Sequence, residues 1–240
     1  MNYIHVNEEN NWPSFVDLMS TFVLILIILL VFARVSEVLI RRSQRIKFQM
    51  KIREHVVRMQ TKPGKHLTCD DPNEARIKFH IYIPTDDLFE SGSDRLNNTK
   101  SLEKLGSYLA NLLKNKENMI KKIEVYGHSD IMPISSAAKS QYHSNLGLSA
   151  MRAVSVHDVF TNPDTCGIPS DKILAVGCGE HIPKVFKEFF HSSEYPDFIN
   201  KVLGIKMDEY AKHKLKYQTA AKQLLSPNRR VEVVLYFNEK

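Results

Sequence analysis

The stretch Ser14-Phe-Val-Asp17-Leu-Met-Ser-Thr-Phe-Val-Leu-Ile-Leu-Ile-Ile-Leu-Leu-Val-Phe32 divides this 240-residue chain into a membrane-length segment and a soluble remainder. From Phe15 to Ala33 the apolar run has about 19 residues, which at about 1.5 Å per residue suffices to cross the hydrocarbon core of a bilayer. No basic stretch precedes the run and no small-residue cleavage site follows it, so we expect a retained signal anchor. No later run approaches this length, and the residues after about 60 are expected to form a soluble domain.

Asp17 is the one ionisable residue between Trp12 and Arg34. A carboxyl group at the centre of a membrane helix costs roughly 2.5–3.5 kcal/mol, and less near an end. Two interpretations follow. Ser14 and Asp17 have capping-box spacing, so Asp17 can stabilise the start of the helix. Alternatively, Asp17 binds and releases a cation, since ionisable residues inside a span mark functional sites.

Composition excludes several classes of site. The net charge is +6, and much of the excess follows the apolar run, where basic residues meet anionic lipid headgroups. The three cysteines are odd in number and lack metal-like spacing, which argues against a disulfide framework or metal site. No Ser-His-Asp pattern, carboxylate pair or Gly-rich phosphate loop is present, so we expect no enzyme, no catalytic residue, no metal and no cofactor.

Hydrophobic periodicity predicts a membrane helix followed by an α/β domain. Residues 34–60 should continue as a helix, in which Leu39, Ile46, Met50 and Val57 form either a coiled-coil seam or part of a solvated single helix. Beyond the Thr61–Gly64 break, the pattern predicts strands at 76–83, 122–126, 172–176 and 230–237, and helices at 94–116 and 145–160. This βαβαβ(α)β order implies two layers, with the helices on one face of the sheet.

The expected organisation therefore has four parts. An N-terminal segment covers residues 1–12, and a transmembrane helix covers 13–33. A juxtamembrane helix and linker cover 34–74. The α/β domain covers 75–240 and contains an irregular helical insertion at about 181–225.

The membrane segment resembles the flagellar stator B subunit (MotB) family. The resemblance rests on Val16-Asp17-Leu18-Met19-Ser20-Thr21-Phe22, which has the family's order of an acid, an apolar residue, Met and hydroxyl residues before an aliphatic run. It implies that Asp17 carries a proton or sodium ion, with Ser20 and Thr21 as polar neighbours or as hydroxyls satisfied within the helix. It also implies a self-dimer inside a pentamer of MotA-like multi-span subunits.

Four stretches of the soluble part resemble the OmpA-like peptidoglycan-binding domain in that family's order. They are Asp87–Ser93, Gly127-His-Ser-Asp130, Asn145-Leu-Gly-Leu-Ser-Ala-Met-Arg152-Ala153, and Pro227-Asn-Arg-Arg-Val-Glu232. The resemblance implies that Asp130 and Arg152 bind the ammonium and carboxylate groups of diaminopimelate in the cell-wall peptide. Such zwitterion recognition needs one fixed acid and one fixed arginine.

Three further residues are supporting candidates for the peptidoglycan site, namely Asn145, Asn228 and Arg229. The alternatives are an internal Asp130–Arg152 ion pair without a ligand and a simple capping role for Asn228. Residues 131–144 and the insertion after Glu180 are longer than the family's usual connections. Both flank the expected cleft and could cover it.

The family that the chain resembles includes flagellar stators and the Zorya anti-phage defence motor. We favour a Zorya-like subunit, because the chain has the insertion and lacks the basic N-terminus and long linker of flagellar members. The rivals are a flagellar-type stator and a passive peptidoglycan tether.

This family assignment implies a bacterial inner-membrane protein with a cytoplasmic N-terminus, a periplasmic domain and no direct nucleic-acid contact. The positive-inside rule favours the inverse orientation, since basic residues follow the span and none precede it. A cytoplasmic nucleic-acid-binding domain on an anchor is therefore the third candidate.

Overall fold

The computed structural model describes residues 12–59, 67–71, 77–97, 99–114, 119–189 and 191–238. Contacts divide the chain into two compact units, Met1–Lys47 and Phe48–Lys240, which are described separately. The expected segment before Trp12 and the predicted break at 61–64 lie outside the described residues.

A continuous helix, α1 (Trp12–Arg58), contains the apolar run. It begins upstream of Ser14, so Ser14 does not hold the predicted N-cap position; its side chain lies outside the described ones. The apolar side chains from Phe15 to Val31 are exposed all round the helix, as expected of a membrane span. This helix contains an 18-residue stretch with a mean hydropathy of 2.8, and it is the one in the described part of the chain that is long and apolar enough to cross a membrane.

The last turns of α1 belong to the second unit. Phe48, Ile52 and Val56 recur every fourth residue and are buried in its core. Met50 and Val57 of the predicted coiled-coil seam are exposed. The compact unit thus begins at Phe48, earlier than the expected residue 75, because a different face of the helix packs against the domain.

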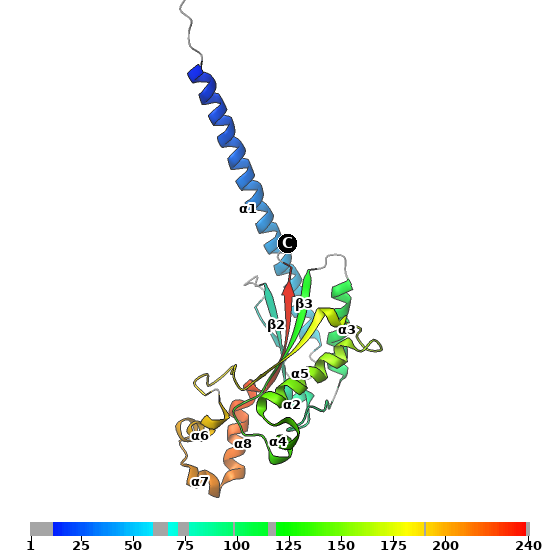
Figure 1. Ribbon diagram of the computed structural model, residues 1–240, viewed down its shortest axis with the longest axis vertical. Coiled ribbons are helices and arrows are strands. Elements are labelled where there is room, and N and C mark those ends of the chain that lie inside the picture. The colour runs from blue at the N-terminus through cyan, green and yellow to red at the C-terminus, as the bar shows by residue number, and fades with distance from the viewer. Residues whose placement is uncertain are drawn as a thin grey trace, which may run out of the picture. The chain divides into compact units, whose positions relative to one another are not determined.

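A mixed five-stranded sheet forms the centre of this unit, with the order β1-β2-β5-β3-β4 (Figure 1). The β3 and β4 strands are parallel, and the other neighbours are antiparallel. Register places Ile81, Val233, Val125 and Ala175 in one row across the core-facing side. The strand bounds are β1 (Thr68–Cys69), β2 (Lys78–Pro84), β3 (Ile120–His128), β4 (Ile173–Gly179) and β5 (Arg230–Phe237).

Two helices, α3 (Lys100–Lys114) and α5 (Asn145–Thr161), cover this side of the sheet (Figure 1). The leucines of α3 recur at helical spacing and are buried against the core. The α5 backbone lies directly on β3, since a Cβ on Gly127 would sit 2.0 Å from the Ser149 carbonyl oxygen. Glycine at 127 therefore permits the close approach that holds α5 beside the end of β3. The predicted two-layer fold class is confirmed.

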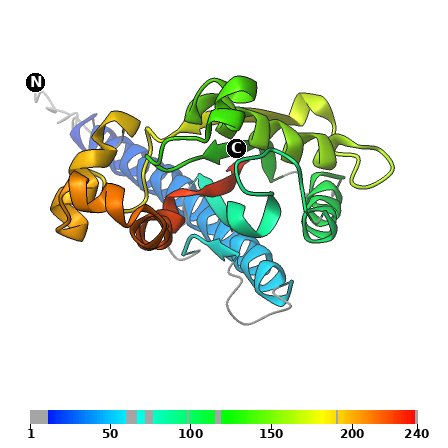
Figure 2. The same ribbon diagram turned by 90° about the horizontal axis from the view of Figure 1, so that it is seen from below.

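Residues 131–144 and the insertion after Glu180 both contain short helices. The first of these connections, between β3 and α5, contains α4 (Ser136–Tyr142). A separate short helix, α2 (Thr85–Leu88), follows β2. The insertion forms its own apolar cluster around Phe198 and Ile199, in a group of helices distinct from α3 and α5 (Figure 2). The remaining elements are η2 (Ser170–Lys172), η3 (Ser192–Glu194), α6 (Tyr195–Leu203), α7 (Met207–Lys212), α8 (Lys214–Leu225) and η4 (Ser226–Asn228).

Candidate functional site

A pocket of about 340 Å³ lies where the end of β3, the start of α5, the α2 region and the insertion meet. Its lining combines three acidic residues, three basic residues and several uncharged polar groups. The lining residues are Asp86, Phe89, Glu90, Ser91, Gly92, Ser129, Asp130, Met132, Pro133, Ile134, Ser135, Asn145, Leu148, Arg152, Gln218, Lys222 and Arg229.

Asp130 follows β3 directly and is buried in the pocket wall, with 5% of its surface exposed. Its Oδ1 accepts a hydrogen bond of 2.9 Å from the Met132 backbone, and its Oδ2 accepts one from Arg229. Burial raises the pKa of the Asp130 carboxyl; the Arg229 guanidinium opposes this without reversing the direction. The carboxylate is thus fixed in position by the protein.

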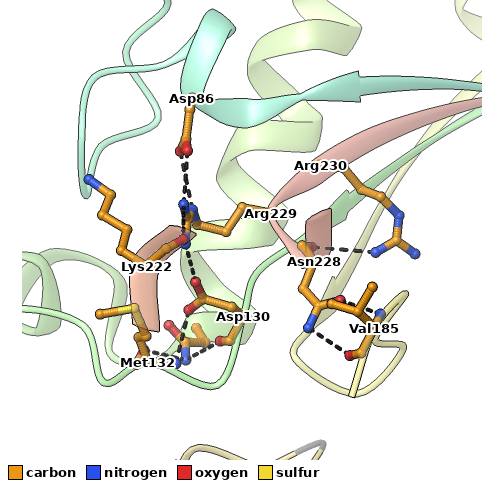
Figure 3. A network of polar contacts seen from close by, with 9 residues as sticks. Asp86, Asp130, Met132, Val185, Lys222, Asn228, Arg229 and Arg230 are labelled. Carbon is orange, nitrogen blue, oxygen red and sulfur yellow. Dashed lines mark hydrogen bonds and ion pairs between the residues drawn. The ribbon is translucent and has the colours of Figure 1, made fainter. Parts of the chain in front are cut away.

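Arg229 joins three parts of the site (Figure 3). Its Nε and Nη2 donate to the two carboxylate oxygens of Asp86, at 3.1 and 2.8 Å, and its Nη1 donates to Asp130. Nη2 also donates to the Lys222 backbone carbonyl at 3.0 Å. One guanidinium therefore connects α2, the end of β3 and the insertion helix α8, a geometry that a planar five-donor fork allows and an ammonium does not.

Arg152 projects from α5 into the same pocket and is 5% exposed. Its Nε donates to the Ser93 carbonyl at 2.9 Å, and its guanidinium carbon lies 5.2 Å from the centre of the Phe89 ring. Among the described residues, no hydrogen-bond or ion-pair partner is found for Nη1 or Nη2. The described contacts therefore contain no Asp130–Arg152 ion pair. Asp130 pairs with Arg229 instead.

Two smaller polar groups complete the inner wall. The Asn145 amide donates to the carbonyls of Asp130 and Met132, at 3.0 and 3.1 Å, and so shapes the loop that carries the acid. The Ser129 hydroxyl is buried and has no hydrogen-bond partner in the described part of the chain. Ser129 is a lining residue of the pocket, and its buried hydroxyl has unused donor and acceptor capacity.

Asn228 is the predicted peptidoglycan-binding residue that does not line the pocket. Its buried side chain forms hydrogen bonds with the start of the insertion (Figure 3). The Asn228 oxygen accepts from the backbone N–H groups of Lys184 and Val185, at 2.7 and 2.8 Å, and its amide nitrogen donates to the Val185 carbonyl at 3.1 Å. Asn228 therefore secures the start of the insertion, a structural role related to the capping alternative.

Both extended connections line the pocket, and the pocket stays open between them. The β3–α5 loop contributes Met132 to Ser135, and α8 contributes Gln218 and Lys222. The Tyr142 hydroxyl, at the end of α4, donates to the Asp94 carboxylate at 2.6 Å. This bond holds α4 next to Ser93, whose carbonyl accepts from Arg152. The expectation that the insertions border the cleft agrees with this geometry, and they form its walls without filling it.

A second polar cluster lies on the opposite face of the sheet. Glu232 accepts from Arg230 Nε at 2.6 Å and pairs with His80 Nδ1 at 3.1 Å. His128 is 2% exposed, and burial lowers its pKa to about 4. Its Nε2 lies 3.3 Å from Glu232, but neither ring nitrogen has hydrogen-bond geometry with a described residue. Burial disfavours ionisation of Glu232, but His80, His128 and Arg230 lower its pKa to about 2.

The predicted ion-binding residues lie on α1 in the first unit. The hydroxyls of Ser20 and Thr21 donate to the Asp17 carbonyl, at 2.8 and 2.9 Å, so both are satisfied within the helix. No described residue forms a hydrogen bond or ion pair with the Asp17 carboxylate.

The polar pocket residues that the sequence did not indicate as site candidates include Asp86, Ser129, Gln218 and Lys222. Asp86 and Ser129 adjoin or belong to the quoted motifs, so their positions could have suggested them. Gln218 and Lys222 lie in the insertion, where no pattern in the sequence indicated which residues face the site.

Comparison with protein families finds that a family model described as the OmpA family matches residues 88–188. This range contains the pocket residues Asp130, Asn145 and Arg152. A comparison with curated protein sequences found no match.

Among solved structures, the chain is similar to a MotB-like protein from Desulfovibrio vulgaris, with a TM-score of 0.50 and 20% identity over 82% of this chain and 99% of that one. The cell wall anchor of the type VI secretion system from Pseudomonas aeruginosa has a TM-score of 0.47 at 20% identity, covering 78% of this chain and 99% of that one. The periplasmic domain of Helicobacter pylori MotB has a TM-score of 0.42 at 18% identity, covering 67% and 77%. The first of these likenesses supports the fold alone.

Proposed function

We propose, on the premise that residues 88–188 form an OmpA-family domain, that this chain is a single-pass inner-membrane protein that grips peptidoglycan with its soluble domain. Arg152 carries the proposal. Its guanidinium is buried in the pocket wall, with Nε anchored and Nη1 and Nη2 without a described partner. A ligand carboxylate is the group that such a fork binds in two-point geometry.

The ligand is a cell-wall peptide containing diaminopimelate, whose side chain ends in an ammonium and a carboxylate. Arg152 binds the carboxylate. Asp130 accepts from the ammonium, since an ionised carboxylate has about four acceptor sites and the described contacts use two. Asn145 and Arg229 hold Asp130 in place.

Sedimentation with purified sacculi tests wall binding. We expect Arg152→Met to reduce the bound fraction at least tenfold, because it removes a charge-assisted contact worth about 1.5–3 kcal/mol. Arg95→Met is the matched control, since Arg95 is exposed near the site and does not line the pocket. Equal binding of the wild type and Arg152→Met would reject the proposed site.

At the other end of the chain, we propose that Asp17 carries a proton or sodium ion through the membrane. The proposal is supported by the position of this carboxylate within the apolar run and by its lack of a described protein partner. The chain would then act as the stator-like subunit of an ion-driven motor, as a self-dimer surrounded by a pentamer of MotA-like subunits. The satisfied hydroxyls of Ser20 and Thr21 favour the competing passive tether, in which Asp17 has no transport role.

Asp17→Asn separates the motor from the tether. A motor subunit loses its activity and keeps sacculus binding, whereas a tether keeps both. A Zorya-type role predicts that the same variant abolishes protection against phage in a strain that carries the chain with its genomic neighbours; a flagellar-type role predicts lost motility. A reporter fused after Lys240 tests the proposed periplasmic orientation, and cytoplasmic signal would reject it.

A further inference from the structure

The insertion adds cationic and amide groups to the pocket from α8. Gln218 and Lys222 lie four residues apart, so they share one face of the helix, and both line the pocket. The remainder of the pocket belongs to elements that the two-layer domain itself supplies. The insertion therefore contributes two polar side chains to the lining of the pocket.

The position of α8 at the pocket is fixed by two independent contacts. Ala221 and Leu225, which flank Lys222, are buried in the insertion's own core, at 0% and 1% exposed. The Lys222 carbonyl also accepts from Arg229 Nη2. The backbone of Lys222 is thus held at the pocket wall, and its ammonium group extends away from the Arg229 network (Figure 3).

Pairing within the pocket leaves Lys222 as a cation with capacity for a ligand. Arg229 pairs with both Asp86 and Asp130, so its guanidinium is shared between two carboxylates. Burial raises the pKa of Asp86, but Arg229 and the further positive charge of Lys222 lower it. Lys222 has no side-chain hydrogen bond or ion pair with any described residue, and the same holds for the Nη groups of Arg152. The pocket therefore presents two cationic donors from two different helices, α5 of the two-layer domain and α8 of the insertion.

We infer that Lys222, with Gln218 beside it, binds a second carboxylate of the wall peptide and selects peptides in which that carboxylate is free over peptides in which it is amidated. This inference rests on the proposed function, in which Arg152 takes the first carboxylate. In a γ-linked stem peptide, the glutamate next to the diamino acid retains its α-carboxylate, which supplies the second anion.

Calorimetric titration of the full chain in detergent tests this specificity. The probes are two diaminopimelate-containing tripeptides that differ only at the glutamate α-carboxyl, one free and one amidated. Because Lys222 is exposed, its contribution should be that of a solvated ion pair, and we expect the wild type to prefer the free acid about two- to fivefold. This preference should shrink as salt is raised.

Lys222→Gln should abolish the preference, and Lys222→Glu should invert it, with little change in affinity for the amidated peptide. Lys216→Glu is the matched control, since it makes the same charge change on α8 at a residue that does not line the pocket and whose ammonium lies 5.5 Å from the centre of the Tyr217 ring. Binding of both peptides with equal affinity, unchanged by Lys222→Glu, would overturn this inference and leave the proposed function intact. Binding of neither peptide by the wild type would overturn the proposed function and this inference with it.

Discussion

The guanidinium of Arg229 donates a hydrogen bond to the buried carboxylate of Asp130. Asp130 is therefore an anchored acid. Arg152, the other charged residue of the predicted pair, lines the pocket, and its Nη groups have no described partner. A structural role for Arg229 and the proposed ligand-binding role for Arg152 lead to different predictions for the two arginines.

Replacement of Arg229 by methionine should destabilise the domain strongly. It leaves the carboxylates of Asp86 and Asp130 without their cation and removes the bond to the Lys222 carbonyl. Removal of one partner of a buried pair costs about 3–5 kcal/mol. Urea denaturation followed by circular dichroism, in detergent, measures this free energy, with Arg95→Met as the exposed control. Stability equal to wild type would show that Arg229 does not connect these elements.

Asn228→Ala should affect stability and spare ligand binding. The substitution removes the three hydrogen bonds that the buried Asn228 side chain forms with the backbone of residues 184 and 185, at a cost of about 1–3 kcal/mol. Asn200→Ala, at an exposed position of α6, serves as the control. A large loss of sacculus binding in a folded Asn228→Ala protein would place Asn228 in the ligand site after all.

The end of α1 should contribute to the stability of the soluble domain. Ile52 is fully buried in the core, so Ile52→Ala should lower the free energy of unfolding by about 2–5 kcal/mol. Met50 lies two residues earlier and is 45% exposed, so Met50→Ala should change the free energy of unfolding by less than about 0.5 kcal/mol. The reverse order of effects would favour the coiled-coil seam that the sequence pattern suggested.

Acid should destabilise the domain through the His128–Glu232 cluster. The unfolded histidine titrates near 6.5, and the buried one near about 4, so the unfolded chain binds more protons in this window. The stability contributed by neutral His128 is present above pH 6.5 and is lost as the pH falls toward 4, by on the order of 3 kcal/mol. The contribution of ionised Glu232 is present above 4.5 and is lost as the pH falls toward about 2.

Unfolding measured from pH 8 to pH 3 tests this dependence. His128→Gln should flatten the slope between pH 6.5 and 4, whereas His157→Gln, at a part-exposed position on α5, should leave it unchanged. A wild-type stability that does not vary with pH between 6.5 and 4 would contradict the assignment of His128 as a buried neutral group.

The sequence was sufficient for the parts of the fold that have a strong local pattern. Alternating apolar residues located β2 and β5, and helical spacing located α3 and α5. Short elements such as β1, α2 and α4 were missed, because two to seven residues carry too little periodicity. The register of α1 on the domain was also missed, since Ile46–Met50–Val57 and Phe48–Ile52–Val56 are both apolar series and tertiary contacts decide between them.

The candidate site was predictable to the extent that the motifs are local. Asp130, Asn145, Arg152 and Arg229 meet in one pocket, as the resemblance implied. The choice of Arg229 over Arg152 as the partner of Asp130 depends on residues far apart in the chain, and no spacing rule encodes it. The same holds for Lys222, whose place at the pocket follows from how the insertion core packs.

The proposed wall-binding role requires that Arg152 bind the side-chain carboxylate of diaminopimelate. The most direct measurement is calorimetric titration with two stem tripeptides that are identical except that one carries diaminopimelate and the other carries lysine, which lacks that carboxylate. We predict that the wild type binds the diaminopimelate peptide at least about tenfold more tightly, and that Arg152→Met binds both equally. Equal affinity of the wild type for the two peptides, or discrimination that survives in Arg152→Met, would contradict the claim.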